Sequence, residues 1–506
     1  MRNFCTILLG ILIPTFSFST EVLSQGPLTL KIQLGQMGHK PWDPNASAQV
    51  RFNFNNAVHE KPFHFTNKYE ILPGYISKWR WDYKNEQYVL TLADIKFHNG
   101  RAISSRDFEY TIVRPFISTL NRPERQLLNE IVGLKNLKPG EQFKSGMVPG
   151  IKILDDKTIA LKLVRPNSFF LYSFGENVPP LVPQEELQED HYTFRNLPVG
   201  CGKFRVTWSD PETSKTILQR IEPTSGKSPQ VLEIYNHDNA LFNKVDLAVG
   251  PGAAALPRDS KDYTWVKSDV PIAVQVIDFN FGDAAVKNSD FRRMLKLAIN
   301  KEKVVEPYKS MAALSEDLIP SNLSARVSRT SEYDPITAKK IFENLPKKMR
   351  DRRYIIYFHG AQQVPLYIST LIDQWKAIGL NFEARGTDSI DFEKKHRDGI
   401  MYAYGRVTSF ADPLKIFSFY LPTSPNKLTS PKDDKKFLAM YDEINSTESV
   451  EGRIEKIREL SDYFRSETRQ IPLFENYENF TFGKHVKSVG IENIYTSLDY
   501  DLIELQ

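Results

Sequence analysis

The second half of the chain alternates between patterns typical of helices and patterns typical of strands. Asp290 is a good N-cap, and apolar residues then recur on one helical face at Phe291, Met294, Leu295, Ala298 and Ile299. Further helical stripes run over 335–345, 368–375 and 454–464, and strand-like runs lie at 354–357, 380–384 and 471–474. Because strands that alternate with helices form a sheet covered by those helices, this half predicts an α/β lobe.

The first half is richer in strand patterns. Leu28, Leu30, Ile32 and Leu34 alternate with polar residues, which is the period of a half-buried strand. Another strand is predicted over 88–92, and a hairpin over 151–163 with acidic turn residues. A chain of 506 residues is long enough for two or more folded units of this mixed α/β kind.

The charges are nearly balanced. The chain has 66 Lys and Arg residues against 62 Asp and Glu residues, which gives a net charge of +4. Proteins that bind nucleic acids usually have a strong basic excess, so this balance argues against such a partner.

Residues 1–19 have the features of a secretory signal peptide. Arg2 gives a positive start, an apolar run follows over 7–18, and Ser17 and Ser19 offer a cleavage site. The run is shorter than the ~20 apolar residues that span a bilayer, so a membrane anchor is not expected. We predict cleavage within 19–26 and export to the periplasm. The mature chain then keeps one cysteine, Cys201, and cannot form an intrachain disulfide.

No catalytic or metal-binding motif stands out. His59 and His64 resemble the start of a zinc-protease helix, but they are five residues apart and Pro62 would interrupt the helix. Cys201 has no evident activating neighbour, so an inert thiol is favoured over a nucleophile. We therefore expect no enzymatic activity, no metal site and no cofactor. These features favour a binding protein that holds a ligand between two lobes, with a secreted hydrolase as the alternative.

The stretch 81–112 carries the most distinctive motif. It has Trp81, the strand 88–92, the run Lys-Phe-His-Asn-Gly at 96–100, and a capped helix from Ser105. This stretch resembles the signature of the family 5 extracellular solute-binding proteins, which are dipeptide- and oligopeptide-binding components of ABC importers. Asn99 replaces the usual Asp and suits the same tight turn. Further matches follow in family order at 198–204, 208, 245–247, 279–280, 291–294, 298–302, 333–335, 375–380 and 471–473.

The resemblance implies a two-lobed periplasmic-binding-protein fold of type II, with an additional domain inserted in the first lobe. The first lobe is then expected to consist of 27–45, 166–270 and 478–506. The inserted domain is expected at 46–165 and the second lobe at 271–477.

The resemblance also points to a ligand-binding segment. In peptide-binding members, a strand of the second lobe ends in Gly-Trp followed by Asp-x-x-Asp/Glu-Pro, and the first Asp pairs with the peptide ammonium. In the corresponding residues 405–413, Arg406 stands for the Trp and Ser409 for that Asp. A hydroxyl supplies no countercharge for a buried ammonium, whereas an arginine suits a carboxylate or phosphate. The candidate ligand-binding residues are Tyr404, Gly405, Arg406, Thr408, Ser409 and Phe410.

Two hypotheses follow for this segment. In the first, Arg406 and Ser409 line the cleft, and the ligand is neutral or anionic and not a peptide with a free N-terminus. In the second, Arg406 points outward or bridges the lobes, and the correspondence with the family is shifted by a residue or two.

The resemblance implies a function in transport. The protein would be a monomeric periplasmic substrate-binding component of an ABC importer, which closes around a small solute or peptide and delivers it to a permease in the inner membrane. The alternative is a ligand sensor, or a protein that presents its ligand to a receptor without transport.

Overall fold

The computed structural model describes residues 27–35, 42, 48–66, 70–120, 125, 128–167, 169–175, 178–210, 215–224, 226–236, 245–249, 261–360, 363–387, 396–407, 412–422, 427–431, 433–490 and 497–506. The predicted signal peptide lies outside these residues. In the part of the chain that is described, no helix is long and apolar enough to cross a membrane.

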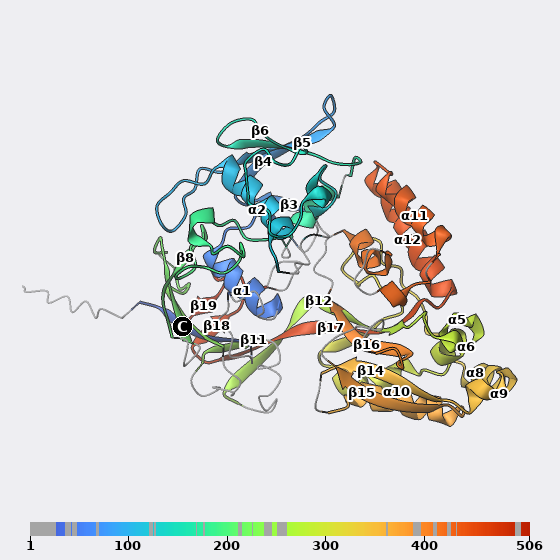
Figure 1. Cartoon of the computed structure of the whole chain (residues 1–506). Helices are drawn as coiled ribbons and strands as arrows, with labels where there is room; N and C mark the ends of the chain where they lie inside the picture. Colours follow the sequence, from blue (N-terminus) through green and yellow to red (C-terminus); the bar gives the residue numbers. More distant parts are fainter. Residues whose placement is uncertain are drawn as a thin grey trace, which may run out of the picture.

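One large sheet runs through both halves of the molecule (Figure 1). The described strands follow the order β15–β14–β16–β12–β17–β11–β1–β10–β9–β8, and β13 also pairs with β17. The two longest strands, β12 (Tyr263–Phe279) and β17 (Gln470–Gly483), are antiparallel neighbours at its centre. They pass from one half to the other, so the two halves share a continuous hydrogen-bonded backbone.

The first lobe lies on the β11 side of the sheet. Its strands are β1 (Thr29–Gly35), β8 (Phe204–Asp210), β9 (Lys215–Arg220), β10 (Val231–Asn236) and β11 (Leu247–Val249), with β18 (Val486–Ser488) and β19 (Glu504–Leu505) in a separate pair. Helix α1 (Ala48–Val58) packs on β1 and β8. Leu30, Ile32 and Leu34 are fully buried in this core, which confirms the strand predicted from their alternation.

A second unit, called the inserted unit below, has its own four-stranded antiparallel sheet in the order β4–β5–β7–β6. Its elements are β2 (Phe63–Phe65), β3 (Ile71–Pro73), β4 (Ile76–Asp82), β5 (Gln87–Leu92), β6 (Ile151–Ile153), β7 (Thr158–Lys162), α2 (Ser105–Ile117), η1 (Leu134–Asn136), η2 (Phe170–Phe174) and η3 (Gln184–Glu186). The pairing of β6 with β7 confirms the predicted hairpin. Ser104 and Asp107 form a capping box that begins α2.

The second lobe has the predicted α/β alternation. Its strands are β13 (Ala312–Leu314), β14 (Arg353–His359), β15 (Asn381–Thr387) and β16 (Met401–Val407). Its helices are α5 (Ala284–Lys287), α6 (Ser289–Leu297), α7 (Lys301–Val305), η4 (Glu306–Tyr308), α8 (Pro335–Asn344), α9 (Lys347–Arg350), α10 (Leu366–Ala377), η5 (Pro413–Tyr420), η6 (Lys427–Thr429), α11 (Lys435–Asn445) and α12 (Val450–Ser466). The parallel strands β14 and β15 are joined through α10. The N-cap of α6 is Asn288, which accepts a hydrogen bond from the Phe291 amide, and not the predicted Asp290.

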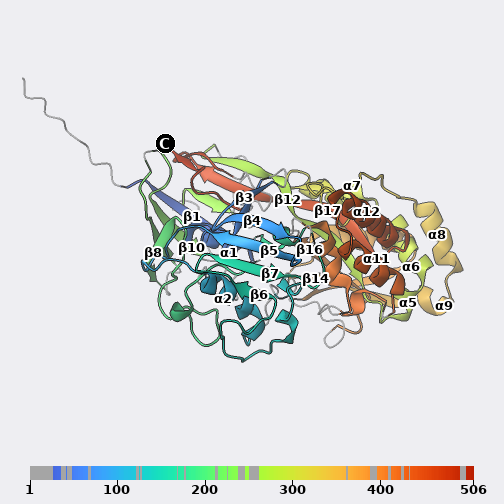
Figure 2. The same cartoon turned by 90° about the horizontal axis from the view of Figure 1, so that it is seen from above.

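The hydrophobic cores correct two of the predicted domain boundaries. Phe54, Ala57 and Val58 of α1 belong to the core of the first lobe, so 48–58 groups with that lobe and not with the inserted unit. The core of the inserted unit extends from Phe63 to Cys201 and so continues well past residue 165. Figure 2 shows the inserted sheet on the first-lobe side of the molecule and α11 and α12 on the second-lobe side.

Candidate functional site

The strands that join the lobes are interrupted where they pass between the two cores. Residues 263–267 of β12 pair with 479–483, and 273–278 pair with 470–476, with register shifts around Pro271. Ser268 closes this bulge: its hydroxyl donates to the Val270 carbonyl at 2.7 Å and accepts from the Glu478 amide at 3.0 Å.

The bulge coincides with the boundary between the cores. Val266 and Phe480 pack in the first-lobe core, whereas Val274 and Ile277 pack in the cores of the second lobe. Because bulges bend a strand and weaken its ladder locally, the connection between the two lobes is weakest-paired at this position of β12 and β17.

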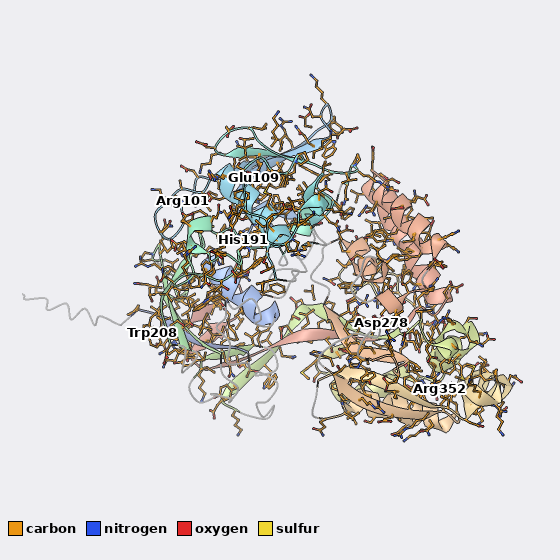
Figure 3. The ribbon with its side chains drawn as sticks, viewed as in Figure 1. Arg101, Glu109, His191, Trp208, Asp278 and Arg352 are labelled. Atoms are coloured by element: carbon orange, nitrogen blue, oxygen red, sulfur yellow. The ribbon has the colours of Figure 1, made fainter. Side chains whose placement is uncertain are left out.

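Asp278 lies at the second-lobe end of β12, where Figure 3 labels it, and it is buried in a polar network. Arg406, on β16, donates from Nη2 to Asp278 Oδ2 at 2.6 Å. The same carboxylate accepts hydrogen bonds from the hydroxyls of Tyr404 and Tyr420, both at 2.8 Å. The guanidinium also lies over the rings of Tyr420 and Phe419, with 4.6 and 4.9 Å to their centroids. These contacts fix Arg406 from several sides.

The electrostatics of this network keep the arginine charged. Burial alone would lower the pKa of Arg406, but Asp278 and the surrounding tyrosines outweigh burial and raise it. Burial raises the pKa of Tyr404 and Tyr420, so both stay protonated and donate to Asp278. The network is therefore an internally neutralised ion pair.

This arrangement corrects the expectation for Arg406. Only 2% of Arg406 and 1% of Asp278 is exposed, so the guanidinium neither points outward nor offers a free charge to an anionic ligand. Tyr404 is half-buried and turned to the same pair. Gly405 is exposed and lies on the opposite face of the strand, next to Gln275 and Asn476. Thr408, Ser409 and Phe410 lie outside the described residues.

A cavity of about 780 Å³ lies between the inserted unit and the second lobe. Its walls combine apolar side chains with charged groups from both bodies. The inserted unit contributes Phe116, Asn129, Glu130, Leu137, Val164 and Arg165, and the second lobe contributes Lys415, Ser418, Leu421, Leu438, Tyr441 and Asp442. Sequence reasoning missed these residues because Glu130 and Lys415 are far apart in the chain. The closest sequence signal is Asp412-Pro413, which begins the short helix that carries Lys415.

Two of the stretches that resemble the family, 96–100 and 198–204, contact each other and have a structural role. His98 Nε2 lies 3.0 Å from the Gly202 carbonyl, and Nδ1 accepts from the Gly200 amide at 3.4 Å. Gly200 and Gly202 press against the end of α1, where a Cβ on either would come within 3 Å of Val58 backbone atoms. The motif therefore joins the inserted unit to the first lobe and leaves no room for a side chain at these glycines.

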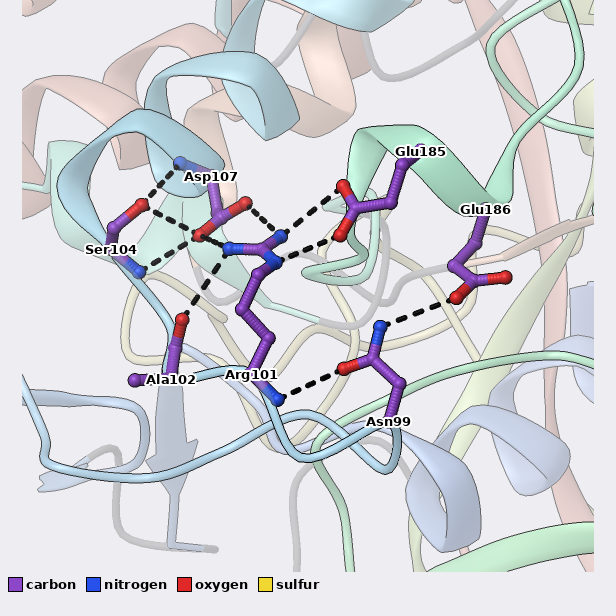
Figure 4. Close-up of polar contacts among 7 residues, drawn as sticks. All are labelled: Asn99, Arg101, Ala102, Ser104, Asp107, Glu185 and Glu186. Carbon is purple, nitrogen blue, oxygen red and sulfur yellow. Dashed lines mark hydrogen bonds and ion pairs between the residues drawn. The ribbon is translucent and has the colours of Figure 1, made fainter.

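Arg101, at the end of the same motif, is also structural (Figure 4). It forms two hydrogen bonds to the Asp107 carboxylate, at 2.7 and 2.9 Å, and two to the Glu185 carboxylate, at 2.8 and 3.4 Å. Asn99 contacts Glu186 at 3.2 Å. These contacts hold η3 against the start of α2.

Cys201 is buried, and burial raises the pKa of its thiol to about 12. A thiol in this state has almost no thiolate at neutral pH, which supports the inert interpretation over the nucleophile. His64 contacts Glu60 at 2.6 Å at an exposed position. Across the described ranges, no group of three His, Cys, Asp or Glu side chains is placed to hold a metal ion.

Comparison with solved structures identifies the fold. The chain is similar to the ABC-transporter substrate-binding protein CtaP from Listeria monocytogenes, with a TM-score of 0.76, 16% identity, and coverage of 94% of this chain and 99% of that one. It is similar to DppA from Helicobacter pylori in complex with the peptide STSA (TM-score 0.72, 15% identity, 94% and 98% coverage). It is also similar to AgaA from A. tumefaciens R10 in complex with agropinic acid (TM-score 0.73, 13% identity, 94% and 99% coverage). The fold is the two-lobed periplasmic-binding-protein fold of type II, which confirms the sequence-based prediction.

The family follows from the sequence itself. The pattern of the bacterial extracellular solute-binding proteins, family 5 (middle region), matches residues 70–427, which is well over half of the chain. This protein therefore belongs to family 5 of the bacterial extracellular solute-binding proteins, as its motifs indicated. A comparison with curated protein sequences found no match.

Proposed function

We propose that this protein is the periplasmic substrate-binding component of an ABC importer. It would capture a small solute or peptide between its lobes and deliver it to a membrane permease. The observation that carries the proposal is the bulged crossing of β12 and β17 between separate hydrophobic cores. Two rigid bodies on such a hinge close when a solute makes better contacts with both than with either alone.

The ligand contacts are proposed to come from the end of β16 and from the segment that follows it. Gly405, Thr408, Ser409 and Phe410 are the candidates, and Ser409 stands where peptide-binding members carry the carboxylate for an ammonium. Arg406 is not among the candidates because Asp278 already neutralises its charge. The ligand class that fits best is therefore a solute without a free amino terminus.

The fold leaves the ligand class open. Of the structural relatives, DppA was solved with a peptide and AgaA with agropinic acid. The side chains that line the site, and not the architecture, must therefore select the solute.

Mass spectrometry of the small molecules released on denaturing freshly purified protein tests this proposal. We expect one dominant solute without a primary amine. Adding it back should make the protein more compact in small-angle X-ray scattering. A dominant peptide with a free N-terminus would contradict the role given to Ser409, and unchanged scattering with every released solute would contradict the capture mechanism.

A substitution tests the same segment directly. Ser409→Asp supplies the carboxylate that the peptide-binding members have, so it should create measurable affinity for the peptide Ser-Thr-Ser-Ala. Ser409→Asn has the same shape without the charge and is the matched control. Equal affinity of both variants for this peptide would show that the side chain at position 409 does not contact the peptide ammonium.

Export and delivery need their own tests. The N-terminus of protein recovered from the periplasm should lie between residues 20 and 27 if the predicted signal peptide is cleaved there. Loss of solute uptake in cells that lack the protein would support transport, whereas normal uptake would favour a sensor or presenting role.

A further inference from the structure

The inserted unit and the second lobe meet at a charged contact, where α11 approaches the inserted sheet (Figure 1). Lys415 of η5 donates from its ammonium to Glu130 Oε1. The other carboxylate oxygen of Glu130 accepts from Asn167 Nδ2 at 2.6 Å. Lys415 is buried, and Glu130 is half-buried. Each charge is thus neutralised by a partner on the opposite body.

Backbone contacts hold Glu130 in place. Its carbonyl accepts from the Val164 amide at 2.8 Å, beside the bridge between Ile131 and Leu163. Glu130 is therefore tied by its backbone to the segment that directly follows β7 and does not lie at a free loop end.

Two further contacts cross between the same bodies. The guanidinium of Arg453, on α12, lies 5.4 Å from the ring centroid of Phe169 in the inserted unit. Arg453 is fully buried and also donates to Asp412 Oδ2 at 2.9 Å. Arg165 lies 3.6 Å from Asp442 at the edge of the cavity. Cross-lobe attraction is therefore concentrated around Glu130 and Lys415, on the face of the second lobe formed by η5, α11 and α12.

The electrostatics of this contact keep both groups charged. Burial would raise the pKa of Glu130, but the Lys415 ammonium and Asn167 outweigh it, so the pKa is lowered. Burial would likewise lower the pKa of Lys415, yet Glu130 raises it. Both groups thus stay charged in this contact. Separating the lobes would remove the main stabilising partner of each.

The contact is also connected to the proposed ligand segment. Asp412 caps η5 by accepting from the Leu414 amide at 3.0 Å, and its carbonyl accepts from the Lys415 amide at 3.1 Å. Lys415 therefore follows the segment 408–411 by one tight helical turn.

We infer that Glu130 and Lys415 form an interlobe latch, through which the inserted unit stabilises the closed form without touching the solute. This inference rests on the proposed capture mechanism and gives the inserted unit a part in it. Glu130 and Lys415 are then positioning residues. Their contribution appears in the closing equilibrium, and hence in the apparent affinity for solute.

Small-angle X-ray scattering of the full protein tests the latch. The probe is the low-molecular-weight extract released from wild-type protein, titrated until the protein is fully contracted. Glu130→Gln and Lys415→Met should each raise the half-saturating dose about tenfold, as expected for the loss of one charged hydrogen bond. The half-saturating dose of the double variant should be no higher than that of the more strongly affected single variant, because both substitutions remove the same contact. The exchanged pair Glu130→Lys with Lys415→Glu should recover part of the loss.

Asp94→Asn is the matched control, since it removes an acid of the inserted unit that is 96% exposed and pairs with Lys157 within that unit. It should contract like wild type. If wild type contracts and Glu130→Gln contracts at the same dose, the latch is wrong and the capture mechanism stands. If wild type itself never contracts, the capture mechanism fails whatever the variants do. The latch would also be wrong if the double variant raised the half-saturating dose by the product of the two single-variant factors, because the two side chains would then act independently.

Discussion

Replacing Arg406 with methionine tests whether the ion pair with Asp278 holds the second lobe together. The substitution keeps an apolar stem of similar length but leaves the Asp278 carboxylate buried without its cation. Removing one partner of a buried pair costs about 3–5 kcal/mol. Asp278 keeps the hydroxyls of Tyr404 and Tyr420, so we expect the lower end of that range, about 3 kcal/mol of unfolding free energy.

Urea denaturation, followed by far-ultraviolet circular dichroism, measures this loss. The matched control is Arg353→Met, because Arg353 pairs with Glu383 at 2.9 Å but is 64% exposed. An exposed pair is screened by water, so the control should change the unfolding free energy only slightly. Adding Asp278→Leu to Arg406→Met should recover part of the loss, because the double change leaves no unpaired buried charge. A loss for Arg406→Met no larger than that of the control would refute the reasoning.

Three further predictions concern the junction between the inserted unit and the first lobe. Gly202→Ala should cost about 1–3 kcal/mol in urea denaturation because its Cβ would lie 2.7 Å from backbone atoms of α1, whereas Gly226→Ala, with open space around it, should be neutral. Burial lowers the pKa of His59 to about 3, so the unfolded chain binds a proton at this histidine before the folded chain does as the pH falls. The free energy of unfolding should therefore decrease by about 3 kcal/mol between pH 6.5 and pH 4. His59→Gln should remove that decrease. Cys201 should resist a thiol reagent in the native protein at pH 8 and react at once in denaturant, and fast native labelling would show that its burial is incomplete.

Local features of the fold could be predicted from the sequence because local patterns cause them. The alternation at 28–34 became β1, and Asp334 caps α8 by accepting from the Thr337 amide at 2.9 Å. Gly100 has a φ of 88°, which explains why a glycine follows Asn99 in the tight turn. The grouping of α1 could not be predicted in this way, since its apolar face does not reveal which core it will join.

The candidate site was less accessible to sequence reasoning. Arg406 was correctly placed near the end of a second-lobe strand, but its partner Asp278 lies 128 residues away on another strand. Whether an arginine binds a ligand or a buried carboxylate depends on that partner. Glu130 and Lys415 are 285 residues apart, and neither belongs to a recognisable motif. Pairs of this kind arise from the packing of whole units, which local periodicity does not encode.

The position of β17 has a consequence for how the molecule is completed during synthesis. This strand lies between β12 and β11, yet it follows both of them in the chain and is therefore made after them. Until residues 470–483 arrive, β12 and β11 each carry an open edge at the middle of the sheet, and only the covalent chain of β12 joins the two lobes there. A chain cut short before Gln470 would leave the described sheet as two halves that are joined by the chain of β12 but not hydrogen-bonded to each other, so β17 is the strand that completes the sheet.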